Sequence, residues 1–562
     1  MTDTIPDEYW GFPITHYPLM YTNHAISTRL EAAYTGSRHL YHQIAAPVAI
    51  NDISKLADPT LGPAAYNELI SSVTLKKLKE ILELTYYPSN YGKFASPELV
   101  AGCITLMSSL KPLPLAYEYG YLCLRVMVIA LNACLLKYGS YLDVVIQHMK
   151  AVSSKEYLST FWEGSARLIS REFIDGDSGT PLYGVLTSSP RSLWTTPLMD
   201  QWDLHTLLYL LHDDKKNLFI ALQQADSLGL SGVMFVLRGY VESKRVGMEE
   251  HDYKHSFYGP YSRVLYRYRL VVPNFGLEPG VMKYLCNKPP VMCCLEEEET
   301  IDVGDSRNLM QAYTLYLESN PSERCAATVF LFQLVAPLMV PGCEDLIPGV
   351  LGATLPVFWN SLSTYSPSIV IESLATFLTM FSNIVEPFRL KGVEQPWVIQ
   401  LEDQIIINDT VELMLRVTLL SDSSRKHRGK ADESKLIDTI VERLTHLMLS
   451  APRQHLIDRC EKLGSFYDWS NYRQIFRPGS PGNPVPDGCQ YIMLNYVFKG
   501  IFGQQWEAKL ASLRIVTGHC YNPRCPAPVD AQFVCPTTGA VYCSSKCLAL
   551  SWTYAAVPPS VK

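Results

Sequence analysis

Apolar residues recur at the spacing of an α-helix through most of this chain, and this periodicity restricts the possible fold more than any other feature. Between Lys435 and Met448, apolar side chains occupy one helical face and charged side chains the opposite one: Leu436, Ile437, Ile440, Val441, Leu444 and Leu447 against Asp438, Glu442 and Arg443. Such a stripe is typical of an amphipathic helix. The two-residue alternation of a half-buried strand is hard to find, so the sequence predicts an all-α fold.

The length and composition suit a folded array of such helices. The chain has 562 residues, of which 48% are hydrophobic and 18% charged, so it can bury an ordinary core. Because a single core stops growing near ~250–300 residues, we expect a large irregular helical array or an α-solenoid-like domain, although no fixed repeat period can be aligned. Helical segments are expected near 65–87, 97–110, 114–152, 154–173, 200–246, 303–340, 344–386, 397–421 and 432–449, with a break at 288–300 that is rich in Pro, Cys and acidic residues.

Changes in composition along the chain predict its parts. Residues 1–60 are rich in Tyr, His and Pro, and we expect an irregular N-terminal arm over the first helices of a helical domain at 61–476. The run RPGSPGNPVPDG at 477–488 cannot continue a helix and is the predicted linker. Residues 489–516 are again apolar and helix-like, so they are expected to dock back on the helical domain. A zinc finger and tail are expected at 517–562.

Cysteines gather near the C-terminus. Of the 15 cysteines, five lie between Cys520 and Cys547, where Cys520-x4-Cys525 and Cys543-x3-Cys547 form two short-spaced pairs. The N-terminus shows no secretory signal, and we expect an intracellular protein, cytoplasmic or nuclear, with reduced thiols. Four thiolates at about 2.3 Å satisfy a tetrahedral Zn²⁺ ion. The sequence therefore predicts one structural zinc ion held by Cys520, Cys525, Cys543 and Cys547.

The second pair lies in a segment that is similar to the MYND-type zinc finger. The second half of that motif is Tyr-Cys-Ser-x-x-Cys followed by a Trp, and Tyr542, Cys543, Ser544, Cys547 and Trp552 match it. The family usually holds two zinc ions, the first of them bound by the first and third cysteine pairs. The resemblance therefore implies that the four predicted ligands complete the first site.

The second site of the family is incomplete in this chain. Cys535 is present, but Thr538 stands in place of its partner, and Ala555 and Pro559 occupy the places of the final His and Cys. The resemblance implies a degenerate finger with a single site. The first pair is also spaced x4 instead of x2, so Cys535 or His519 could replace one of the predicted ligands.

Two upstream segments, 117–131 and 228–239, resemble parts of large fungal all-helical proteins that end in such a finger. MYND fingers generally bind short proline-containing peptides. The resemblance implies a non-catalytic interaction or scaffold protein whose partner is a protein or peptide. Since ~30 residues cannot hold a core without their metal, we expect chelation to disorder the finger and to leave the thermal transition of residues 60–516 nearly unmoved.

The alternative is an enzyme of unrecognised type, a hydrolase or a methyltransferase, in the helical domain. The turn DGDSGT at 175–180 resembles protease motifs but lacks their partner residues. His205, His212 and Asp213 could bind a metal, yet His212 and Asp213 sit at a charged helix end, where solvated groups are common. The sequence contains no phosphate-binding loop and no SET-domain motif, so we expect no catalysis.

Charge and hydropathy restrict the partners. The net charge of −7 and the pI of about 6.0 show no basic excess to match a nucleic-acid backbone, which argues against nucleic acid as a partner. The most apolar stretch, 326–340, is shorter than the ~20 residues of a membrane helix and contains Pro337, so no membrane span is predicted. The basic run 425–430 could act in nuclear import. Five further thiols could hold a second metal but are expected in the core: Cys286, Cys293, Cys294, Cys325 and Cys343.

Overall fold

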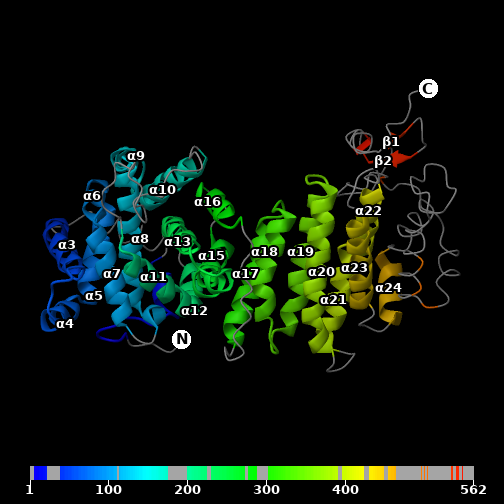
Figure 1. Cartoon of the computed structure of the whole chain (residues 1–562), viewed down its shortest axis with the longest axis horizontal. Helices are drawn as coiled ribbons and strands as arrows, with labels where there is room; N and C mark the ends of the chain where they lie inside the picture. The colour runs from blue at the N-terminus through cyan, green and yellow to red at the C-terminus, as the bar shows by residue number, and fades with distance from the viewer. Residues whose placement is uncertain are drawn as a thin grey trace. The chain divides into compact units, whose positions relative to one another are not determined.

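The computed structural model describes residues 6–21, 38–110, 113–174, 199–224, 229–272, 276–287, 301–389, 395–422, 430–448 and 453–463, together with the positions 495, 499, 503, 520, 533–535, 540–543 and 547–548. These residues are overwhelmingly helical (Figure 1), which confirms the predicted all-α fold. The chain forms two compact units, residues 1–296 and 297–562. The boundary falls in the predicted break at 288–300, inside the range predicted as one helical domain, and it keeps each core near the ~250–300 residue limit.

Unit 1 is built of helices of one to six turns. They are α1 Tyr17–Met20, α3 Arg38–Lys55, α4 Pro63–Ser72, α5 Leu75–Glu83, α6 Tyr91–Phe94, α7 Pro97–Ser109, α8 Glu118–Tyr138, α9 Leu142–Ala151, α10 Tyr157–Ile174, α11 Gln201–Asp213, α12 Lys215–Gln224, α13 Ser231–Lys244, α14 Glu250–Tyr253, α15 Gly259–Val271 and α16 Glu278–Leu285. Short 3₁₀ turns connect several of them, and a π-helical turn, Lys254–Tyr258, joins α14 to α15.

Helix α8 is the central element of unit 1. It is apolar all round, as expected of a helix enclosed by others, and it packs on α5, α6, α7, α10 and α13. By length and composition, α8 and the segment Pro367–Phe388 of unit 2 could each cross a membrane, and 100% and 56% of their most apolar windows are buried. The burial of this window of α8 among neighbouring helices is typical of the core helix of a folded unit.

The N-terminal region combines an arm and a helix. Residues 6–21 lie against the start of α8, where the backbone N–H groups of Glu118 and Tyr119 donate to Phe12 and Trp10 at 2.8 and 3.0 Å. This part includes the short helix α1 at Tyr17–Met20. The prediction of irregular structure over 1–60 is wrong for 38–55, which form α3, because tertiary packing on α5 and α7 stabilises a segment with weak periodicity.

The contact between α3 and α7 is close enough to require glycine. A Cβ atom on Gly102 of α7 would lie 2.0 Å from the carbonyl oxygen of Ile53 on α3. The two helix backbones therefore approach more closely than side chains at this position would allow. Ile53 itself is fully buried.

Side-chain caps fix several helix starts. Ser96 Oγ accepts a hydrogen bond from the Leu99 N–H at 3.2 Å, with Pro97 as the first residue of α7. In unit 2, the Asp302 carboxylate accepts from the Asp305 N–H at 2.9 Å and starts α17. Each cap satisfies an N–H group that has no partner inside its helix.

Unit 2 has a two-layered arrangement. Its helices are α17 Val303–Ser319, α18 Cys325–Val335, α19 Ile347–Ser361, α20 Pro367–Arg389, α21 Pro396–Ile407, α22 Thr410–Asp422, α23 Lys430–Met448 and α24 Arg453–Leu463. Helix α19 packs on α17 and α21, while α20 packs on α18, α22 and α23. Alternate helices thus stack in two layers, as in an α-solenoid, in agreement with the prediction for the helical region.

Aromatic side chains fill the space between the layers of unit 2. The Phe332 ring of α18 and the Phe377 ring of α20 have centroids 4.8 Å apart, and Phe358 of α19 lies 5.7 Å from Phe377. Pairs of buried aromatic rings stabilise a fold by more than the burial of their apolar surface alone.

The described strands lie near the C-terminus. Strands β1 Phe533–Val534 and β2 Val541–Tyr542 pair antiparallel, with Phe533 opposite Tyr542. The predicted linker 477–488 lies outside the described residues, and of the predicted docking helix 489–516 only positions 495, 499 and 503 are described.

Candidate metal centre

A two-stranded hairpin positions the cysteines of the C-terminal segment. Cys535 directly follows β1, and its N–H donates to the Ala540 carbonyl at 2.7 Å, which continues the pairing of β1 with β2. Cys543 directly follows β2, and Cys547 and Leu548 are helical. The short hairpin therefore fixes the start of the second cysteine pair.

Three of the four predicted ligands converge. The sulfur atoms of Cys520, Cys543 and Cys547 all lie within 4.8 Å of one another. The sulfurs of Cys543 and Cys547 are 3.4 Å apart, and none of the three residues is disulfide-bonded. Four thiolates around a Zn²⁺ ion at about 2.3 Å would have their sulfur atoms about 3.8 Å apart. The donor type and the spacing both fit zinc, and within the described part of the chain this is the one group of three or more candidate ligands close enough to share an ion.

The remaining candidate ligands have different outcomes. Cys525, the predicted fourth ligand, and His519 lie outside the described residues. Cys535 is described and fully buried, but its sulfur is not part of the group of three. The site therefore retains the prediction of Cys525 as the fourth ligand.

The cysteines sit in a small apolar cluster. Cys520, Cys535, Tyr542 and Cys547 are buried together, with Ala540, Val541 and Leu548 packed against them. Cys543 is half-buried. Apolar surroundings limit water at the site and strengthen electrostatic attraction between thiolates and a cation.

A buried arginine ties this site to the helices of unit 2. Arg416 Nη2 on α22 donates to the carbonyl oxygen of Cys520 at 3.3 Å. The same guanidinium donates twice to Glu412, at 2.7 and 2.9 Å, and lies 5.7 Å from the Trp359 ring centroid. The side chains of Arg416 and Glu412 are 0% and 2% exposed. This contact could not be predicted from the sequence, because a Glu–Arg pair four residues apart is typical of an exposed helix surface.

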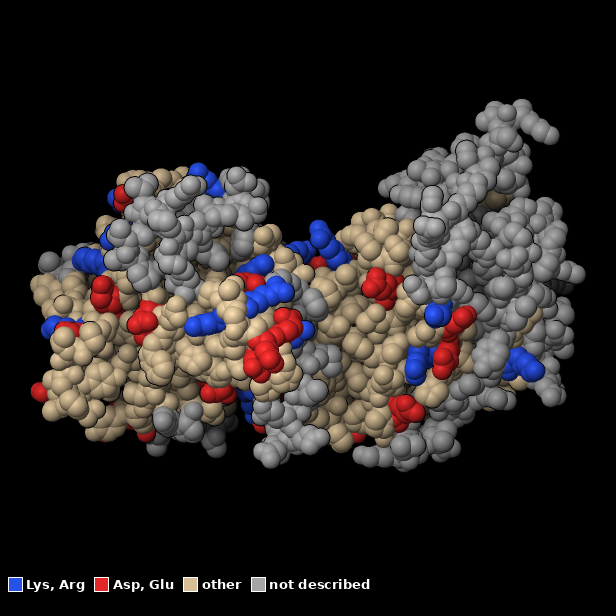
Figure 2. Space-filling model, in the orientation of Figure 1, with Lys and Arg blue, Asp and Glu red and all other residues tan. Residues whose placement is uncertain are grey.

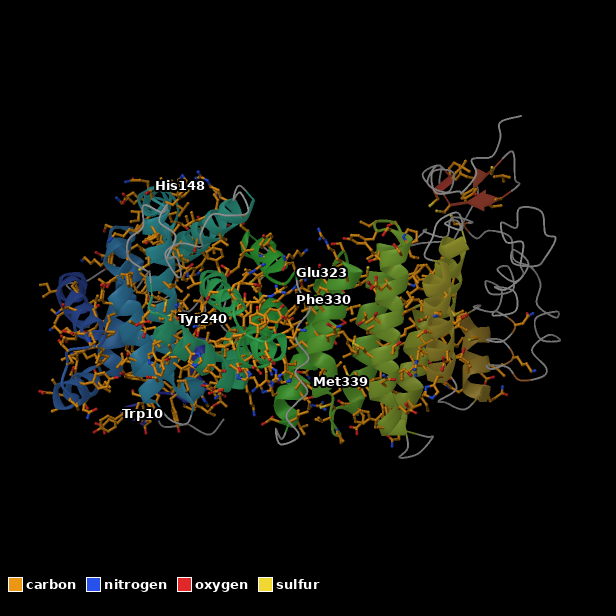
Figure 3. All side chains as sticks on the ribbon, in the orientation of Figure 1. Trp10, His148, Tyr240, Glu323, Phe330 and Met339 are labelled. Atoms are coloured by element: carbon orange, nitrogen blue, oxygen red, sulfur yellow. The ribbon has the colours of Figure 1, made fainter. Side chains whose placement is uncertain are left out.

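The histidines singled out in the sequence do not assemble a metal site among the described residues. His205 Nδ1 lies 3.2 Å from the Tyr240 hydroxyl, and Figure 3 shows Tyr240 among the helices of unit 1. Burial, then Lys215 and Arg263, lowers the pKa of His212 to about 4. His212 Nδ1 lies 3.4 Å from Asp213 Oδ1. The 175–180 turn lies outside the described residues.

The scattered thiols behave as core residues where they are described. Cys286, Cys325 and Cys343 are each at most 2% exposed. Cys343 Sγ lies 3.5 Å from Ser306 Oγ. These positions agree with the prediction of core thiols, and Cys293 and Cys294 lie outside the described residues.

One buried carboxyl group has no evident structural role. Both oxygens of Glu402 on α21 are buried and have no hydrogen-bond partner within the described part of the chain. Burial, and then the neighbouring Asp403, raises the pKa of Glu402 to about 8. Asp403 itself pairs with Arg459 of α24 at 2.9 Å. Glu402 is therefore protonated at neutral pH, as expected of a carboxyl group enclosed in a core.

Comparisons of this chain with protein-family models, with curated proteins and with solved structures find no match. The resemblance to MYND fingers stays a prediction carried by the spacing of Tyr542, Cys543, Cys547 and Trp552.

Proposed function

We propose that this chain is a non-catalytic zinc-binding protein that interacts with other proteins. The observation that carries the proposal is the convergence of the Cys520, Cys543 and Cys547 sulfurs within 4.8 Å. With Cys525 as the fourth ligand, all coordination positions of a single structural Zn²⁺ ion are thiolates, and no position is left for water or substrate. A closed site of this kind stabilises a fold and does not catalyse a reaction.

The nature of the partner follows from the resemblance and from the helical units. A single-site MYND-like finger would take a peptide, including a proline-containing one, and α-solenoid helices present long surfaces to protein partners. The chain would act inside the cell, in the cytoplasm or nucleus, where thiols stay reduced.

The surface charge supports a protein partner over nucleic acid. On the face seen in Figure 2, described Lys and Arg side chains are interspersed with Asp and Glu. Interspersed charge of both signs lacks the basic stripe that a phosphate backbone requires. The net charge of −7 points the same way.

The zinc content of the full-length protein tests this proposal. We expect one zinc ion per chain by elemental analysis, and loss of the ion in Cys543→Ser and in Cys525→Ala. Cys535→Ala is the matched control, because Cys535 is buried nearby but lies outside the group of three sulfurs. Zinc loss in Cys535→Ala but not in Cys525→Ala would reassign the fourth ligand, and a chain with two zinc ions or none would contradict the proposal.

A further inference from the structure

Cys543 differs from the other cysteines in its access to solvent. Among the cysteines that the structure describes, it is the one that is not buried. Cys520, Cys535 and Cys547 are 3%, 0% and 7% exposed. Since oxidation of a thiolate requires contact with the oxidant, a small oxidant from solvent meets the Cys543 sulfur first.

The nearest sulfur is placed to complete the reaction. Cys547 Sγ lies 3.4 Å from Cys543 Sγ, and a disulfide bond is about 2.05 Å long. A movement of little more than 1 Å therefore brings the two atoms to bonding distance. The two residues are four apart in the chain, so closing the loop between them orders few additional residues.

We propose that Cys543 and Cys547 form a redox-sensitive pair, which a peroxide converts to a disulfide with release of the zinc ion. This inference rests on the zinc site proposed above. It assigns Cys543 as the sulfur that is oxidised first and Cys547 as the sulfur that resolves it. The finger would thereby lose its metal, and its binding surface, under oxidising conditions.

The steps balance with peroxide as the oxidant. The Cys543 thiolate attacks one peroxide oxygen, the O–O bond breaks, hydroxide leaves, and Cys543 becomes a sulfenic acid. The Cys547 thiolate then attacks the Cys543 sulfur, the S–O bond breaks, and a second hydroxide leaves as the disulfide forms. The two thiolates lose two electrons and the peroxide gains them. With both thiolates consumed, zinc keeps too few ligands to stay bound.

Zinc release and disulfide mapping on the full-length, zinc-loaded protein test the inference. Hydrogen peroxide is added in stoichiometric amounts, and released zinc is measured with a colorimetric chelator. Lys546 lies between the two cysteines, so trypsin places them in separate peptides, 525–546 and 547–562. We expect these peptides to stay linked after oxidation, with fragmentation placing the bond at Cys543, and each disulfide to accompany the loss of one zinc ion.

Two variants separate this pair from its neighbours. Cys535→Ala should release zinc and form the same link, because Cys535 lies outside the group of three sulfurs. Cys547→Ser removes a zinc ligand together with the resolving sulfur, so this variant is tested without zinc, and peroxide should leave a sulfenic acid on Cys543 that a dimedone-type reagent detects. Retention of zinc after oxidation, or a disulfide that joins Cys547 to Cys525 or Cys535, would overturn the inference while leaving the zinc site intact. A protein that carries no zinc before oxidation would overturn the proposed function, and this inference with it.

Discussion

Replacing Arg416 with alanine should destabilise unit 2 strongly, since the substitution breaks a buried ion pair. Arg416 and Glu412 are almost completely buried, and their side chains are joined by two hydrogen bonds. Without Arg416, the Glu412 carboxylate stays buried without its cation, and the Cys520 carbonyl loses a donor. Breaking a buried pair from one side typically costs about 3–5 kcal/mol.

Thermal unfolding and zinc titration measure the effect of Arg416→Ala. Since about 1 kcal/mol shifts Tm by ~2–4 °C in a unit of this size, the loss corresponds to about 6–20 °C. Groups that orient metal ligands typically contribute 10–100-fold to metal affinity, so zinc binding should weaken by about that factor. Arg307→Ala is the matched control in the same unit, because Arg307 pairs with Asp345 at the exposed surface and its loss should hardly move Tm.

A double variant separates burial of charge from loss of the Cys520 contact. In Glu412→Met combined with Arg416→Met, no unpaired charge remains, and unit 2 should recover most of the lost stability. Zinc affinity should stay low, because the donor to the Cys520 carbonyl is still absent. If Arg416→Ala melts like Arg307→Ala, or if zinc affinity is unchanged, the buried contact does not have the role assigned to it.

Three further substitutions test the packing of the two units: Glu402→Gln in unit 2, and Gly102→Ala with its control Gly280→Ala in unit 1. The pKa of Glu402, raised to about 8, means that the folded state loses stability as pH rises from about 4 to 8 while the unfolded carboxyl is already ionised. Glu402→Gln removes this loss. In urea unfolding, the free energy of unfolding of the variant minus that of the unsubstituted protein should therefore rise up to about pH 8 and then level off. A difference that stays constant across pH would contradict the raised pKa of Glu402. Gly102→Ala should lower the Tm of unit 1, because a Cβ would lie 2.0 Å from the Ile53 carbonyl oxygen. Gly280→Ala on α16 meets no atom within 4 Å and should instead raise stability by about 0.5–1 kcal/mol; equal effects of the two would refute the close approach.

Helices with a clear apolar stripe were predictable from the sequence, whereas helices that bury polar side chains were not. Helix α23 at Lys430–Met448 contains the predicted stripe, and Ile440 and Leu444 are 1% exposed. Helix α15 has the sequence GPYSRVLYRYRLV, in which Arg267 and Arg269 are buried beside tyrosines. Arginine normally marks an exposed position, so only the tertiary fold reveals that this helix is enclosed.

At the C-terminal site too, local features could be predicted from the sequence and tertiary contacts could not. The spacing of Cys543 and Cys547 is local and predicts that these two sulfurs lie close together, and the two-pair pattern of a zinc site predicts that Cys520 joins them. The link to Arg416 joins residues more than a hundred positions apart, and it depends on how α22 is oriented in its layer. No periodicity or motif reports such a contact, because a buried and an exposed Glu–Arg pair have the same sequence.

The Arg416 contact changes what zinc removal should do to the helical region. In a finger without such a contact, the free energy of zinc binding would stabilise the finger alone. Chelation would then leave the main thermal transition unmoved, as expected from the sequence. A ligand that binds only the folded state stabilises whatever folds together with its site. Arg416 contacts the Cys520 carbonyl, Glu412 and Trp359, so we expect part of the free energy of zinc binding to stabilise α22. Coupling of this kind is reciprocal: the factor by which loss of zinc loosens α22 must equal the factor by which loosening α22 weakens zinc binding. The extra destabilisation that Arg416→Ala causes in the zinc-loaded protein over the chelated protein and the loss of zinc-binding free energy in that variant must therefore be equal. A finger that is a mere appendage makes both of them zero.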